Sequence, residues 1–232
     1  MRSATAGVAA LLLVLGGCSD GHSTAPPEQR PRELLALMVL PKAALGADAA
    51  ALGKSRPSGV VSNARRAATD LDPLVTANSL ARSGRVTGYA LQFGLTDAQA
   101  SRALRRGAGL LQVGTIVDSF RSKAAAAAAM TKTIDDLQRL EGKPLNLGGK
   151  LERMRLVRVR GFRDRAVGLV LTVDLGGVRV YITEVAFRAE HLAAAAAVTR
   201  ADTRAVLPLT TALARRLELR TRRVLAGTSL AG

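Results

Sequence analysis

Tryptophan is absent from this chain of 232 residues, which also has only two tyrosines and four phenylalanines. A hydrophobic core therefore has to be filled mainly by aliphatic side chains. Because 48 % of the residues are hydrophobic, enough of them are present to form one, and a wholly disordered chain is excluded. The length suits one large domain or two small ones.

Cysteine and histidine are almost as scarce, with one cysteine and two histidines in the whole chain. A single cysteine excludes an internal disulfide. Nucleophilic catalysis needs a nucleophile beside a base, and metal sites need clustered ligands. His22 lies in a polar stretch and His191 in a predicted surface turn, and no GxSxG, HExxH, SxxK or CxxC pattern occurs. The sequence therefore predicts no enzyme, no metal site and no cofactor.

The carboxylates give no pair suited to acid–base work. Asp135 and Asp136 are adjacent on a predicted helix and point to different sides, while Asp70 and Asp72 fit cap and turn positions. Glu184 falls within a predicted strand. It is either an end-of-sheet residue paired with an arginine, which we favour, or a buried acid with a perturbed pKa.

Acidic residues are too few to balance the basic ones, since 34 lysines and arginines face 18 aspartates and glutamates, for a net charge of +16. Genomic bias accounts for the preference for arginine over lysine. Attraction to an anionic membrane or wall polymer would account for the low number of acidic residues. Nucleic acid is not expected as a partner, because only Phe162 offers a base a stacking platform among the arginines. The residues we assign to anionic contact are Arg153, Arg155, Arg158, Arg160, Arg215, Arg216, Arg220 and Arg223. A plain solvated face is the alternative.

The N-terminus has the layout of a secretory signal. Arg2 precedes a short apolar run over 9–15, which is too short to span a bilayer as a helix. Leu15, Gly16, Gly17 and Cys18 follow, and this sequence resembles the lipobox of bacterial lipoproteins. The resemblance implies cleavage before Cys18 and a diacylglycerol on its thiol. Residues 1–17 are then the signal peptide and 18–31 a lipidated tether that holds the protein at the extracytoplasmic face of the cell membrane.

Residues 32–84 are expected to be helical and irregular. The stretch 41–61 has scattered glycine, proline and alanine and no clear periodicity. One short helix begins at Ser62 or Asn63, and a second begins at Asp72 and Pro73.

Residues 85–226 predict an α+β domain. An alternating strand is expected over 85–93 and a second strand over 110–117, with a capping box at 96–99 that opens a helix between them. A long alanine-rich helix follows and ends near 140. Four strands then form a meander over 151–160, 166–175, 178–188 and 192–200, and a last helix runs toward 224. The alanines of 193–197 make the fourth strand the least secure by propensity. The predicted fold class is an antiparallel sheet covered by helices, in a single domain.

Residues 85–223 resemble known domains in the order of their predicted elements. Two features support the resemblance: a strand that leads through Phe120 into the alanine-rich helix, and a closing strand over 185–188. This arrangement is similar to the secreted sandwiches of the PsbP/Mog1 type and to the extracellular sensor domains of bacterial Ser/Thr kinases. Such domains generally bind ligands or partners. We therefore expect a binding module for an apolar ligand or an envelope protein. The alternative is an accessory envelope protein that contacts an anionic membrane or polymer. An apolar pocket between the sheet and the alanine-rich helix would favour the binding module.

Overall fold

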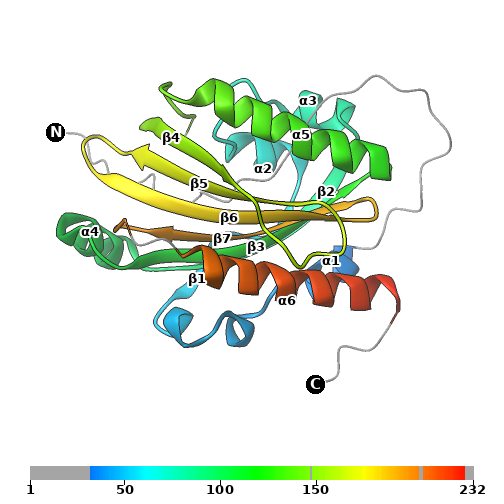
Figure 1. Cartoon of the computed structure of the whole chain (residues 1–232), viewed down its shortest axis with the longest axis horizontal. Helices are drawn as coiled ribbons and strands as arrows, with labels where there is room; N and C mark the ends of the chain where they lie inside the picture. The colour runs from blue at the N-terminus through cyan, green and yellow to red at the C-terminus, as the bar shows by residue number, and fades with distance from the viewer. Residues whose placement is uncertain (1–31, 147, 204–205, 228–232) are drawn as a thin grey trace.

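Seven strands pair side by side in one antiparallel sheet, in the order β1-β2-β3-β7-β6-β5-β4 (Figure 1). The computed structural model describes residues 32–146, 148–203 and 206–227. The strands are β1 (Gly53–Val61), β2 (Arg85–Gly94), β3 (Leu110–Phe120), β4 (Lys150–Val157), β5 (Ala166–Asp174), β6 (Arg179–Ala189) and β7 (Leu192–Arg200). The predicted α+β class, with its C-terminal four-strand meander, is confirmed.

Helices cover both faces of the sheet (Figure 1). The described helices are α1 (Arg32–Met38), α2 (Asn63–Ala68), α3 (Ala77–Arg82), α4 (Asp97–Arg106), α5 (Lys123–Leu140) and α6 (Leu207–Leu225), with two short 3-10 turns, η2 (Lys42–Leu45) and η3 (Ala47–Ala49). One face is packed by α1 and α6, and the other by α2, α3 and α5. In Figure 1, α4 lies beyond one end of the sheet.

The two faces have different cores. Beneath α6, larger side chains such as Phe93, Phe187 and Leu213 fill the space. Beneath the first half of α5, alanines from the helix meet alanines from β6 and β7. Small side chains let the helix backbone approach the sheet closely, so the alanine-rich helix contributes to a dry interface despite the shortage of aromatic residues.

Residues 53–61 correct the expectation of an irregular segment, because they form the edge strand β1. The strand pairs with β2 and shows a register shift between Ser55 and Gly59. Its glycines, proline and serine are poor strand formers, and hydrogen bonds to β2 supply the order that local propensity does not. In the preceding segment, Leu35 and Met38 are buried in the core beneath α6, so residues of 32–84 and of 85–226 contribute to the same sheet and to this same core.

Two of the predicted helix starts follow their capping signals, and a third does not. Ser62 caps α2, and Thr96 and Gln99 form the expected capping box of α4. The predicted start at Asp72 and Pro73 is wrong, because α3 begins at Ala77 with Thr76 as its cap. The carboxylate of Asp72 instead accepts a hydrogen bond from the Leu74 N–H and forms an ion pair with Arg139. These two contacts hold the stretch as a turn.

Candidate functional site

The predicted contact arginines fall into two groups in the sequence, one over 153–160 and one over 215–223, and these groups meet in the structure. The connection between β4 and β5 lies against α6, where Arg215 donates to the carbonyl of Arg160 at 2.8 Å. The backbone N–H of Arg163 donates to Glu218 at 3.0 Å, and Arg222 pairs with both Glu218 and Asp164. One continuous basic surface therefore combines residues from α6 and from the β4–β5 connection.

Several of the predicted contact arginines also hold the fold together. Besides Arg215, Arg216 donates to the carbonyl of Ala44 and Arg220 to that of Leu37. These hydrogen bonds tie α6 to α1 and η2. Arg223 is exposed on α6, and the remaining predicted residues, Arg153, Arg155, Arg158 and Arg160, are exposed on β4 and the connection after it. Their assignment to anionic contact stays a prediction.

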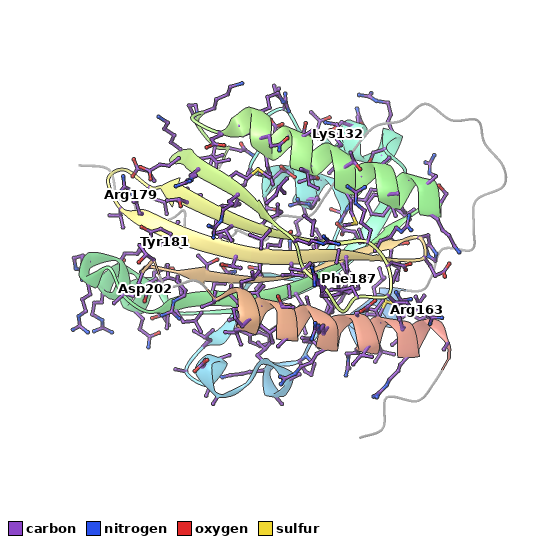
Figure 2. All side chains as sticks on the ribbon, viewed as in Figure 1. Lys132, Arg163, Arg179, Tyr181, Phe187 and Asp202 are labelled. Carbon is purple, nitrogen blue, oxygen red and sulfur yellow. The ribbon has the colours of Figure 1, made fainter. Side chains whose placement is uncertain are left out.

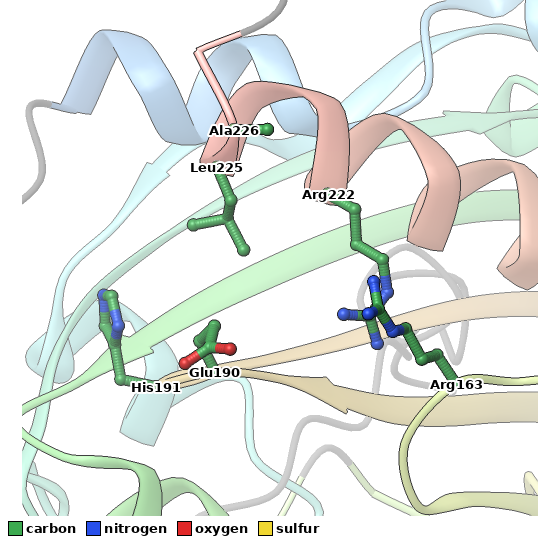
Figure 3. A pocket seen from close by; sticks show the side chains of 6 residues that line it. All are labelled: Arg163, Glu190, His191, Arg222, Leu225 and Ala226. Carbon is green, nitrogen blue, oxygen red and sulfur yellow. The ribbon is translucent and has the colours of Figure 1, made fainter.

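A first pocket, of about 370 Å³, lies at the C-terminal end of α6 (Figure 3). It is lined by Arg163, Glu190, His191, Arg222, Leu225 and Ala226. The guanidinium groups of Arg163 and Arg222 lie together on one side, opposite the hairpin turn that carries Glu190 and His191. His191 thus lies in the turn that the sequence predicts for it.

The charges of this first pocket are largely balanced. Burial disfavours the charged form of Arg222, but hydrogen bonds to Glu218 and Asp164 outweigh that effect and raise its pKa. A hydrogen bond from Lys123 lowers the pKa of Glu190. Because most of these groups already have partners of opposite charge, the pocket has little charge left to attract a ligand.

A second pocket, of about 650 Å³, opens between the C-terminal turn of α4 and the β5–β6 hairpin. Its charged and aromatic lining residues are Arg105, Arg106, Arg179, Tyr181 and Asp202, and we call it the arginine pocket. Arg179, Tyr181 and Asp202 are seen at the same end of the sheet in Figure 2.

The acidic group of the arginine pocket is already neutralised. Arg200 binds Asp202 through two nitrogens, at 2.6 and 2.8 Å, and the Gly109 N–H donates to the same carboxylate. The hydrogen bonds that Arg200 donates to the side chain of Asp202 raise the pKa of Arg200, so both members of the pair stay charged. Arg179 of β6 forms an ion pair with Glu152 of β4. Arg105 and Arg106 are exposed at the end of α4. The pocket therefore has an excess of positive charge.

Sequence reasoning missed Arg105, Arg106 and Arg179 as neighbours. The adjacent arginines at the end of a helix were visible as a pattern, but there they are equally explained by the helix dipole. Only the sheet order brings the β5–β6 hairpin to that helix end. The expected site between the sheet and α5 is instead closely packed in its first half, where Ala126 and Ala129 are both fully buried.

Buried charges lie on the sheet face that α5 covers. Arg85 and Asp118 form a fully buried ion pair at 2.7 Å, and Arg85 also donates to the Val61 carbonyl and to Asn63. Glu184 lies in the middle of β6 and is fully buried, so its expected end-of-sheet position is wrong. Its neighbours on β5 and β7, Leu169 and Ala197, are buried as well.

Two further observations bear on the expected class of protein. Among the described residues, no group of three or more histidine, cysteine, aspartate or glutamate side chains is arranged to hold a metal ion. None of the helices in the described ranges combines the length and apolar character needed to cross a bilayer. Cys18 and its lipobox lie outside those ranges, so lipidation stays a prediction.

Comparison with known proteins identifies a similar fold. The extracellular domain of PknH from Mycobacterium tuberculosis superimposes with a TM-score of 0.53 at 14 % identity, covering 88 % of this chain and 100 % of that domain. The predicted resemblance to kinase extracellular domains is thereby confirmed at the level of the fold. No protein-family model matches the chain. No curated protein matches it either.

Proposed function

We propose that this chain is a lipid-anchored binding module outside the cytoplasmic membrane, and not an enzyme, and that it takes an anionic small ligand in the arginine pocket. The observation that carries the proposal is the pocket itself, an open depression of about 650 Å³ whose lining includes Arg105, Arg106 and Arg179. Volumes of this order are typical of small-molecule sites. The fold shared with an extracellular domain supports the location.

The chemistry of the lining favours an anion that carries a planar or apolar group. Arginine guanidinium groups bind carboxylates and phosphates through paired hydrogen bonds. Because Arg200 already neutralises Asp202, that carboxylate opposes an incoming anion only weakly. Tyr181 adds a ring and a hydroxyl group, and Leu104 and Val178 add apolar surface.

The lipid anchor follows from the lipobox resemblance and is compatible with the position of the domain in the chain. Fully extended, residues 19–31 can reach about 45 Å at roughly 3.5 Å each. Since α1 is the first described element and starts at residue 32, a tether of that length lets the domain lie against the lipid headgroups or clear of them. One acyl chain binds a bilayer marginally and two bind it stably, which suits a diacylglycerol.

The first test is native mass spectrometry of the purified chain, followed by solvent extraction. A stoichiometric co-purifying anion supports the proposal and identifies the ligand class. Titration with inorganic pyrophosphate as a probe anion follows, measured by calorimetry. We expect the double variant Arg105→Ala/Arg106→Ala to bind the probe at least about tenfold more weakly, because two charge-assisted contacts are lost.

The matched control is Arg102→Ala, which removes an exposed arginine that is on the same helix but does not line the pocket. If the free-energy loss per removed charge is the same in the control and in the double variant, the probe senses only the overall charge. Binding that is unchanged in the double variant, together with a clean apo mass, would contradict the proposal.

A further inference from the structure

The outer face of α6 carries an exposed leucine among arginines. Leu219 is 60 % exposed, so its apolar side chain faces the solvent. Arg215 and Arg216 precede it by about one helical turn and Arg223 follows it by one, so all three project from the same side as Leu219. The sequence of α6 contains one acid, Glu218, and its side chain is buried and bonded to Arg222.

The neighbouring segment extends this surface. Leu37 of α1 is 46 % exposed and lies beside α6, where its carbonyl accepts a hydrogen bond from Arg220. Arg160 lies on the other side and accepts from Arg215 through its carbonyl. We define the α6 face by Leu37, Arg160, Arg215, Arg216, Leu219 and Arg223. The exposed acids on the adjoining α1 and η3 are Glu33 and Asp48, so the four arginines leave the surface positive.

We propose that the α6 face docks on the surface of an anionic phospholipid bilayer. Each arginine near such a surface is attracted by the negative headgroups, and its long side chain can reach them while the helix lies in the interfacial plane. Leu37 and Leu219 then insert their side chains at the boundary between headgroups and acyl chains.

The exposed leucines distinguish a bilayer from a soluble anionic polymer. A polymer in water would neutralise the arginines but would leave Leu37 and Leu219 in contact with water. A bilayer satisfies both the charge and the apolar surface, so it is the occupant that both observations fit. The α6 face is also distinct from the arginine pocket, because α6 lies across one face of the sheet while α4 lies at its end (Figure 1). Docking through α6 therefore leaves the pocket open to solvent.

Co-sedimentation with phosphatidylcholine vesicles, with and without phosphatidylglycerol, tests this docking. The protein is the full chain carrying Cys18→Ser, which removes the thiol that a lipid would modify. We expect binding that depends on phosphatidylglycerol and falls as salt rises. Leu219→Ser should weaken the partition about tenfold, because an apolar side chain no longer inserts. Arg223→Gln should weaken it about fivefold, because one interfacial charge is lost.

Matched controls come from other surfaces of the same domain. Leu74→Ser changes a leucine that is 69 % exposed between α2 and α3, and Arg102→Gln changes an exposed arginine of α4. Both should bind vesicles as the parent does. All four side chains are exposed, and unchanged circular dichroism and thermal midpoints will verify that the variants fold.

Three results would overturn the docking proposal. Equal binding to vesicles without phosphatidylglycerol would remove the electrostatic basis. Controls that weaken binding as much as Leu219→Ser and Arg223→Gln would mean that the α6 face has no special part. If Leu219→Ser has no effect while soluble polyglutamate displaces the vesicles, the face binds polyanions and not a bilayer.

Discussion

At the scale of single residues, a glycine makes room for the buried ion pair between Arg85 and Asp118. A Cβ atom built at Gly88 would overlap the Oδ1 of Asp118 and lie 2.8 Å from the Nη2 of Arg85. The pair links the end of β1, the start of α2 and strands β2 and β3 through three hydrogen bonds from one guanidinium group. Glycine at position 88 is therefore required by side-chain packing on the sheet.

The substitution Gly88→Ala should lower the free energy of unfolding by about 3–5 kcal/mol, because the methyl group displaces one partner and leaves a buried charge uncompensated. Urea denaturation measures the change. Gly53→Ala is the control, since a Cβ there meets only a backbone oxygen at 3.9 Å. A loss of similar size at both positions would mean that strand propensity, and not the ion pair, sets the cost.

Two carboxylates should affect stability with opposite dependence on pH. Burial raises the pKa of Asp70 above its ordinary 3.8, so its stabilising contribution is complete below 3.8 and is lost as pH rises through the raised pKa. The hydrogen bond from Lys123 lowers the pKa of Glu190 below its ordinary 4.5, so its contribution is complete above 4.5 and is lost as pH falls.

Urea denaturation from acidic to neutral pH will test both signs against variants that cannot titrate. Relative to Asp70→Asn, the parent protein should lose stability as pH rises. Relative to Glu190→Gln, it should gain stability over the same range. Slopes of the same sign for the two comparisons would be inconsistent with these pKa shifts.

At the scale of elements, α1 depends on α6 for its position. A helix of seven residues is too short to be stable alone, and it is held by burial of Leu35 and Met38 and by the hydrogen bond from Arg220 to the Leu37 carbonyl. Arg220→Ala should therefore speed amide exchange in α1 about fivefold, which corresponds to about 1 kcal/mol. Hydrogen-exchange mass spectrometry will detect this.

The control for that experiment is Arg223→Ala, which removes an exposed arginine from the same helix. Exchange in α1 should be unchanged in this variant. Faster exchange in both variants, or in neither, would show that the Arg220 hydrogen bond does not hold α1.

The two alanine runs show how far local sequence decides an element. Residues 124–129 lie in α5, whereas 193–197 lie in β7. Alanine favours helix in both places. The second run becomes a strand because β3 and β6 pair with it on either side, and its alanines are nearly fully buried there. Hydrogen bonds to two neighbouring strands outweigh a helix preference of a few tenths of a kcal/mol per residue.

At the scale of the whole molecule, the expected anchor can be tested directly. The parent chain, expressed with its signal in a bacterium that processes lipoproteins, should enter the detergent-rich phase of a Triton X-114 extraction. Cys18→Ser should move it to the aqueous phase, because no thiol remains to accept a diacylglycerol. Ser19→Ala is the control for a change beside the cysteine. A parent chain that already stays in the aqueous phase would contradict lipidation.

The sequence by itself determined the elements whose signals are local. Capping residues predicted the starts of α2 and α4, alternation predicted β2, and extended stretches predicted β3 and the meander. Together these elements gave the α+β class. Such signals succeed because a cap or an alternating strand involves residues only a few positions apart.

Only the tertiary structure decided which distant residues meet. It made β1 a strand through its pairing with β2, buried Glu184 at the centre of the sheet and joined the two arginine groupings against α6. It also brought the β5–β6 hairpin to the end of α4 to form the arginine pocket. These features depend on strand order and on contacts between residues far apart in the chain, which composition and short-range periodicity do not encode.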